Sequence, residues 1–310
     1  MSSPYVLSGK IIGIDPGHGG TAETDHFRVG PAGEREEHIN LRVALILRDL
    51  LKESGAHPVL TREEDLNVPL VRRAEIIREA GADVFISIHH NATADRSINY
   101  PIIYFHGNAS QNQAGVRLAR CLADSIKRHM FPPGTPAVIA SDHVIFPQSG
   151  TAVLRHSYGI PGVIGEASFF SCPDEELRLM NPEYNRIEAM AWKEALEEFF
   201  AQSVPMVFPK VSIEGLTPFP VLQEAERMNP EALRWQKNFK DGLALLDEGT
   251  TDSLTAARDH FTASARAFPD SPVARSCHEN LAIIFKRLSM PDESRAQALR
   301  VQEHYPLLQE

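Results

Sequence analysis

The chain has 310 residues, of which 43% are hydrophobic and 23% charged, a globular composition that can fill one large core or two domains and argues against global disorder. Its 31 basic and 41 acidic residues give a formal charge of −10, which argues against a nucleic acid as partner because phosphate backbones are bound mainly by cationic side chains. Its three cysteines, Cys121, Cys172 and Cys277, are too few and too scattered for a disulfide framework or a cysteine-rich zinc site, so any metal would need histidine and carboxylate ligands.

The N-terminus and the hydropathy pattern give no sign of membrane targeting. No run approaches the ~20 apolar residues of a membrane span, so none is expected. Residues Met1–Pro4 lack a basic segment followed by an apolar core, and a strand-like run already begins by Lys10. No secretory signal is therefore visible in this stretch.

From Lys10 to about Phe200, short apolar runs alternate with longer segments of helical periodicity. Strands are predicted over Lys10–Ile14, His57–Thr61, Asp83–Ile88, Ile102–Phe105 and Gly162–Gly165. Helices are predicted over Asn40–Glu53, Val71–Ala80, Ala114–Arg128 and Glu183–Phe200. This alternation predicts an α/β fold, a mostly parallel twisted sheet flanked by helices.

The character of the chain changes where four prolines punctuate residues 204–220 and exclude a persistent helix. We therefore expect an α/β domain over 1–203, a proline-rich linker over 204–222 and a small all-α domain over 223–310. Helices are predicted there over Pro230–Glu248, Leu254–Phe268, Pro272–Leu288 and Glu293–Glu303. Phe268-Pro269 and Tyr305-Pro306 stand 37 residues apart, near the period of helix-pair repeats, so the tail resembles one or two tetratricopeptide-type units. Its Trp235, Phe261 and Phe285 are expected to be core residues.

Three motifs place chemically active side chains at the ends of separate predicted strands. His18 lies in Asp-Pro-Gly-His-Gly-Gly after the first strand, His89 and His90 follow the third, and Glu166 interrupts the last apolar run. Sites in open α/β sheets form at the carboxyl ends of the strands. Two histidines and a carboxylate are a known ligand set for catalytic zinc, and a further carboxylate would then be needed for proton transfer.

These motifs, together with Gly33–Leu41, resemble in order and spacing the zinc-dependent N-acetylmuramoyl-L-alanine amidases of the Amidase_3 type. The resemblance spans about Lys10 to Phe200 and implies Zn²⁺ as cofactor. It implies His18, Glu36 and His89 as metal ligands and Glu166 as the catalytic residue. Where the family usually reads Glu-Leu-Gly-Phe, this chain has Glu-Ala-Ser-Phe over 166–169.

Several neighbours compete for these roles. Glu34 and Glu37 are rivals of Glu36, since an acidic run is also typical of a helix N-terminus. His90 is a rival of His89, although alternation along a strand lets only one of the two reach a metal. Other residues near the motifs are expected to play no part in the site: Arg73 is interpreted as a solvated helix charge, and His143 and His156 are not expected to contact substrate.

The activity implied by the resemblance is hydrolysis of the amide between N-acetylmuramic acid and L-alanine in peptidoglycan, in the cell envelope or periplasm. Two alternatives stay open: a zinc amidase acting on another acyl-peptide, and a non-catalytic scaffold that holds peptidoglycan. Some members of the family carry a long helical insertion over the metal, for which the short connections after Asn91 and Phe105 leave no room. A protein partner, if one exists, is expected to bind the helical tail.

Overall fold

The computed structural model describes residues 6–25, 28–227, 229–230 and 232–308. Met1–Pro4, where no secretory signal is visible, lie outside these residues, as does one residue of the helix expected over Pro230–Glu248. The strands of residues 11–169 form one six-stranded sheet in the order β2-β1-β3-β6-β4-β5. All neighbouring strands run parallel except β4 and β6, which are antiparallel. The α/β prediction is confirmed.

The predicted strands are all present, and one was missed. The strands are β1 (Ile11–Pro16), β2 (His57–Leu60), β3 (Val84–Asn91), β4 (Ile102–Phe105), β5 (Val138–Ser141) and β6 (Gly162–Phe169). Sequence analysis missed β5, although four apolar residues between Pro136 and Ser141 are a strand signal. β5 forms the sheet edge beside β4.

The α-helices described before residue 204 are α1 (Glu36–Glu53), α2 (Leu70–Glu79), α3 (Gln113–Met130), α4 (Ala152–His156), α5 (Pro173–Leu179) and α6 (Pro182–Phe200). The predicted start of α1 at Asn40 is wrong by one turn, because the helix begins at Glu36, with two glutamates that favour its positive end. α4 and α5 were missed. Proline at the first position of α5, followed by three acidic residues, is a start signal that could have revealed it.

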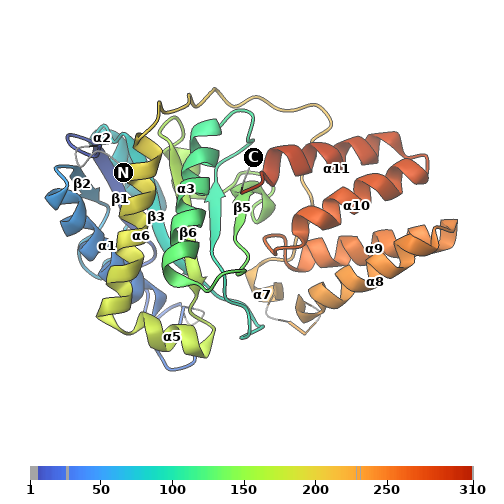
Figure 1. Ribbon diagram of the computed structural model, residues 1–310, viewed down its shortest axis with the longest axis horizontal. Helices are drawn as coiled ribbons and strands as arrows, with labels where there is room; N and C mark the ends of the chain where they lie inside the picture. The colour runs from blue at the N-terminus through green and yellow to red at the C-terminus, as the bar shows by residue number, and fades with distance from the viewer. Residues whose placement is uncertain (1–5, 26–27, 228, 231, 309–310) are drawn as a thin grey trace.

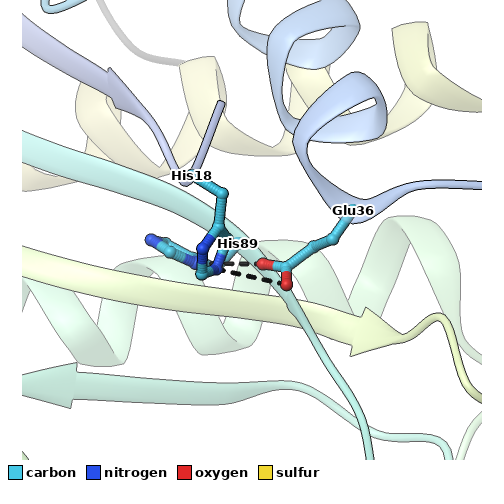
Figure 2. Close-up of side chains that lie close together, drawn as sticks. All are labelled: His18, Glu36 and His89. Atoms are coloured by element: carbon cyan, nitrogen blue, oxygen red, sulfur yellow. Dashed lines mark hydrogen bonds and ion pairs between the residues drawn. The ribbon is translucent and has the colours of Figure 1, made fainter. Parts of the chain in front are cut away.

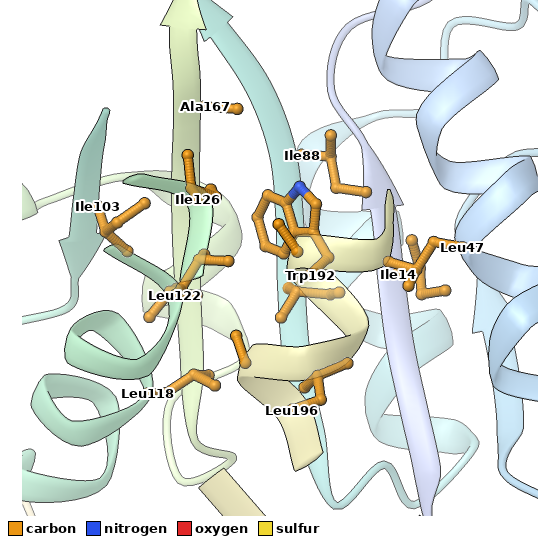
Figure 3. Packing of buried hydrophobic residues seen from close by; sticks show 14 of the residues in the cluster. Ile14, Leu47, Ile88, Ile103, Leu118, Leu122, Ile126, Ala167, Trp192 and Leu196 are labelled. Carbon is orange, nitrogen blue, oxygen red and sulfur yellow. The ribbon is translucent and has the colours of Figure 1, made fainter. Parts of the chain in front are cut away.

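Alternation along the strands divides the core between the two faces of the sheet. On one face, α1, α3 and α6 pack on Ile14, Ile88 and Ile103 (Figure 3). Trp192 of α6 lies against the sheet there, and a Cβ on Gly165 would come within 2.5 Å of its ring. Glycine at this position therefore lets the helix approach the strand closely.

The helical tail packs on the opposite face and beside the β5 edge (Figure 1). It consists of α7 (Glu224–Arg227), α8 (Trp235–Glu248), α9 (Thr251–Ala267), α10 (Ala274–Arg287) and α11 (Pro291–His304). Its four long helices pack consecutively, α8 on α9, α9 on α10 and α10 on α11. Trp235 and Phe261 are buried, as expected, and Phe285 is partly buried.

The tail and the sheet share one hydrophobic cluster. The ring centroids of Phe268 and Phe169 lie 6.5 Å apart, and Phe268 is equally close to Tyr100. The hydroxyl of Tyr104 on β4 donates to Asp270 of the tail. Residues 204–220 contain no helix and cross the top of the molecule in Figure 1. The tail is thus held to the sheet by buried contacts as well as by the linker.

Among the described residues, none of the helices combines the length and apolar character needed to cross a membrane.

Candidate active site

His18, Glu36 and His89 meet at the carboxyl edge of the parallel strands, each delivered by a different element (Figure 2). His18 follows β1, Glu36 opens α1 and His89 lies near the end of β3. His18 Nε2 is 3.2 Å from Glu36 Oε2, and His89 Nδ1 is 3.0 Å from Glu36 Oε1. The two imidazole rings stand edge to face with centroids 4.8 Å apart. One ligand atom from each residue lies within 4.8 Å of the others.

The turn after β1 has little freedom. His18 has a φ of 57°, a left-handed conformation that a residue with a side chain adopts only when its surroundings enforce it. A Cβ on Gly17 would lie 2.2 Å from the His89 ring. The glycine therefore lets the turn pass close enough to place both imidazoles together.

Two buried arginines hold this turn through hydrogen bonds to its backbone carbonyls. Arg62 donates to the carbonyls of Pro16 and Gly17 at 2.9 Å each. Arg73 donates to the Pro16 carbonyl at 2.8 Å and to the His18 carbonyl at 2.5 Å. The interpretation of Arg73 as a solvated helix charge is wrong: its side chain is 2% exposed. Its position on α2 turns it inward, under the turn that carries His18.

Asp15 is the anionic partner of Arg73. Its carboxylate lies 2.9 Å from Arg73 Nη1 and accepts from the hydroxyls of Thr61 and Ser87 at 2.5 and 2.7 Å. Burial opposes the charge of Asp15, but Arg73 and the two hydroxyls outweigh it and lower the pKa of the carboxyl. The start of the Asp-Pro-Gly-His motif is thereby anchored in the core.

Glu36 is buried, with a 1% exposed side chain. Its Oε1 accepts from Asn40 Nδ2 at 3.2 Å and from the backbone N–H of His90 at 3.3 Å. Burial raises the pKa of Glu36, but His18 and His89 outweigh that effect and hold it well below its ordinary value. Its Oε2 accepts no hydrogen bond from the described residues. This buried carboxylate is thus ionised, and its Oε2 lies 3.2 Å from His18 Nε2 and 3.7 Å from Arg28 Nη1.

The structure separates the rival residues. Glu37 lies 2.6 Å from Arg35 and Glu34 3.0 Å from Arg42, so each pairs with an arginine. Glu37 also belongs to a separate cluster with His38 and Asp65.

His90 points to the opposite face of β3, as alternation predicts. Its ring nitrogens lie 2.8 Å from Asn40 Oδ1 and 3.0 Å from Glu188 Oε2. Asn40 therefore touches both Glu36 and His90, a positioning role that sequence analysis missed.

Glu166 lies on β6 directly opposite His89 in the strand register. Its side chain is partly buried, and its Oε2 has no hydrogen-bond partner among the described residues. Burial raises the pKa of Glu166 to about 7, an effect that His89 opposes and Glu36 reinforces. A carboxyl with this pKa can both accept and donate a proton near neutral pH. Beside the His18–Glu36–His89 cluster, it is a suitable general acid and base.

Comparison with known proteins shows the family of this chain. Residues 12–198 match the N-acetylmuramoyl-L-alanine amidase family, Amidase_3. The chain belongs to this family. It is 29% identical over 214 residues to the germination-specific N-acetylmuramoyl-L-alanine amidase of Bacillus subtilis, covering 64% of this chain and 84% of that one. It is 26% identical to the amidase AmiA of Escherichia coli, covering 62% and 76%.

Two solved amidases share the fold. The structure of AmiC2 of Nostoc punctiforme aligns with a TM-score of 0.54 and 25% identity over 63% of this chain and 99% of that one. CwlD of Clostridioides difficile, solved in complex with the GerS lipoprotein, aligns with a TM-score of 0.54 and 26% identity over 62% and 99%. The family match ends at residue 198, so the helical tail lies beyond it.

The remaining histidines flagged by the sequence lie elsewhere. His143 follows β5 and forms a second cluster with His106 and Asp142, and His156 ends α4. Neither belongs to the cluster of His18, Glu36 and His89.

Proposed function

We propose that this amidase cleaves the bond between N-acetylmuramic acid and L-alanine in peptidoglycan, with Zn²⁺ held by His18, Glu36 and His89. The observation that supports this proposal most is the convergence of two imidazoles and a carboxylate next to Glu166, whose Oε2 accepts no hydrogen bond from the described residues. The residues fit zinc well. Their donors are the nitrogen and oxygen ligands that zinc prefers, and three protein ligands are typical of a catalytic site.

When bound, the zinc ion would act as a Lewis acid that activates water and polarises the substrate carbonyl. The chain's own residues position that chemistry. Asn40 and the His90 backbone hold Glu36 Oε1, which leaves Oε2 for the ion. Arg62 and Arg73 hold the turn that carries His18. The three ligands therefore need little rearrangement to bind.

Glu166 would move the proton. As water attacks the carbonyl carbon, Glu166 takes a proton from it, and the carboxylic acid then protonates the departing amide nitrogen, because an amine anion is too basic to leave. A pKa of about 7 suits both steps at neutral pH. One side chain thus serves as general base and then as general acid.

Glu166→Gln tests this role. We expect the variant to retain its zinc content and to lose about 10²–10⁴-fold in turnover of purified sacculi, the usual contribution of general acid–base catalysis. Near-normal turnover by this variant would refute the assignment. Mass spectrometry of the released peptides identifies the bond that is cut, and peptides with an intact muramyl amide would point to another acyl-peptide substrate.

The assignment of Glu36 as a zinc ligand is tested by a matched pair of variants. Glu36→Gln removes a proposed ligand, whereas Glu37→Gln changes the adjacent glutamate, which pairs with Arg35. We expect zinc content per chain to fall only in Glu36→Gln. A fall of equal size in both variants would contradict the choice of Glu36. A wild-type zinc content near zero would favour a non-catalytic scaffold.

We further propose that the enzyme acts on the cell wall, in the envelope or periplasm, and that catalysis resides in residues 1–203. In this proposal residues 204–222 act as linker and residues 223–310 as a tetratricopeptide-like domain that can receive a protein partner. The consecutive packing of α8 to α11 supports the helical-repeat interpretation. That the solved CwlD structure contains the GerS lipoprotein supports a search for a partner here.

A further inference from the structure

A cavity of about 340 Å³ lies at the carboxyl ends of β4 and β5, which is the end of the sheet opposite to the candidate active site. Because β4 runs antiparallel to β6 while β5 is parallel to β4, the carboxyl ends of β4 and β5 point away from Glu166. Gly107 and His143, which follow these two strands, line the cavity together with residues of the linker, α10 and α11. The amidase domain, the linker and the tail all contribute walls. Its volume is within the range of small-molecule sites.

The lining is cationic in a chain whose net charge is −10. Lys210 and Arg300 are the charged side chains among the described lining residues, and none of those residues is acidic. His143, His278 and His304 also line the cavity, but burial lowers the pKa of each, so their imidazoles are neutral. A concave site lined by one sign of charge concentrates ligands of the opposite sign. This composition favours an anion.

Lys210 is held in place at the cavity by His106. Its Nζ lies 3.0 Å from His106 Nε2, and His106 Nδ1 lies 2.8 Å from Asp142 Oδ2. Since Nδ1 donates to the carboxylate, Nε2 carries the lone pair and accepts from the ammonium, which keeps two further N–H groups. The His106–Asp142–His143 cluster, whose donors lie close enough to hold a metal, is therefore better explained as an anchor for this lysine.

His278 lines the same cavity with a buried ring whose Nε2 has no hydrogen-bond partner among the described residues. The residue is 0% exposed, and its Nδ1 lies 2.7 Å from Gln297 Oε1. That oxygen also accepts from Arg300 Nη1 at 2.9 Å, so it is an acceptor in both contacts and His278 Nδ1 must carry the hydrogen. His278 Nε2 is left with a lone pair and has no partner among the described residues. Burial and Arg300 lower the pKa of His278 to about 3, so the ring stays a neutral acceptor.

We propose that this cavity binds a small organic anion that also carries a hydroxyl or amide hydrogen. The anionic group would lie near Lys210, the hydrogen would be donated to His278 Nε2, and the apolar part would pack on Leu216 and Phe219. Sugar acids and phosphate monoesters share this chemistry. The site is independent of the proposed zinc chemistry, since it uses none of the residues that surround Glu36.

Calorimetric titration of the full chain with two probes tests the proposal and distinguishes the sources. The probes are N-acetylmuramic acid, a sugar acid, and glycerol 3-phosphate, a phosphate monoester, with N-acetylglucosamine and glycerol as their uncharged counterparts. We expect at least one anionic probe to bind more tightly than its counterpart and to raise the thermal midpoint, as a ligand specific to the folded state must. Failure of both anions to bind overturns the proposal.

Whether the probe binds in this cavity is tested with a matched pair of variants. Lys210→Gln removes the lysine at the cavity, and Lys240→Gln removes the same charge from the exposed surface of α8. We expect binding to weaken at least about fivefold in Lys210→Gln and to stay unchanged in Lys240→Gln, the effect of one partly exposed charge. A smaller loss, or an equal loss in both, overturns the site.

Nitrogen NMR of the histidine-labelled wild type provides a second measure of location. We expect the probe to shift the His278 Nε2 resonance, because that atom gains a hydrogen-bond donor. A bound probe that leaves this resonance in place overturns the assignment.

Discussion

The contrast between Arg73 and its neighbour Arg72 gives a sharp test of how the candidate site is built. Both lie in the first turn of α2. Arg73 is 2% exposed and pairs with the 1% exposed Asp15, whereas Arg72 is 48% exposed and faces Glu75 and Glu79 on the same helix. We expect Arg73→Ala to lower the free energy of unfolding much more than Arg72→Ala.

The magnitudes follow from burial. Removing one partner of a buried ion pair costs about 3–5 kcal/mol, and the lower end applies here because Asp15 keeps its bonds to Thr61 and Ser87. The exposed pairs of Arg72 contribute about 1 kcal/mol or less. Arg73→Ala should also weaken zinc binding, because the His18 carbonyl loses its donor.

Urea denaturation followed by circular dichroism measures both variants, and zinc content is measured on the same samples. Equal destabilisation by the two substitutions would refute the buried-anchor interpretation. So would an Arg73→Ala variant that keeps full stability and normal zinc affinity.

Three other predictions concern Asp15, Gly17 and Phe268. The lowered pKa of Asp15 means that its carboxylate stabilises the fold above the unfolded value near 3.9 and that this contribution is lost as pH falls through the folded pKa; Asp15→Asn should therefore lose less stability than wild type in acid denaturation below about pH 4. Gly17→Ala should abolish zinc binding while circular dichroism stays native, because its Cβ would lie 2.2 Å from the His89 ring; a fully metallated variant contradicts this geometry. Phe268→Ala should cost about 3–5 kcal/mol and lower a single calorimetric transition for the whole chain; two separate transitions would show that the tail folds independently of the sheet.

The sequence predicted the parts of the site that depend on local pattern. Strand ends located His18, His89 and Glu166, and alternation alone required His89 and His90 to point apart, as they do. Periodicity could not choose Glu36 over its acidic neighbours. That choice came from the spacing of the family motif, and in the structure Glu36 is the glutamate that meets both histidines.

The sequence-based predictions were wrong or incomplete where the outcome depends on tertiary contacts or on very short elements. Arg72 and Arg73 are adjacent, and nothing in their local sequence distinguishes an arginine facing solvent from one facing Asp15 across the core. Arg62 was overlooked because its partners are backbone carbonyls, which leave no trace in a sequence. The β5 strand and the short helices α4 and α5 have too few residues to establish a clear periodicity.

The strand register also links the tail to the catalytic side of the sheet. Ile102 of β4 pairs with Glu166, and Tyr104 pairs with Ile164, so these side chains share one face because residues two apart on a strand point the same way. Tyr104 on that face donates to Asp270 of the tail, and Phe268 packs near Phe169, three residues beyond Glu166. A displacement of the tail would therefore disturb the strands that carry the proposed acid–base residue, even though the tail contributes none of the proposed zinc ligands.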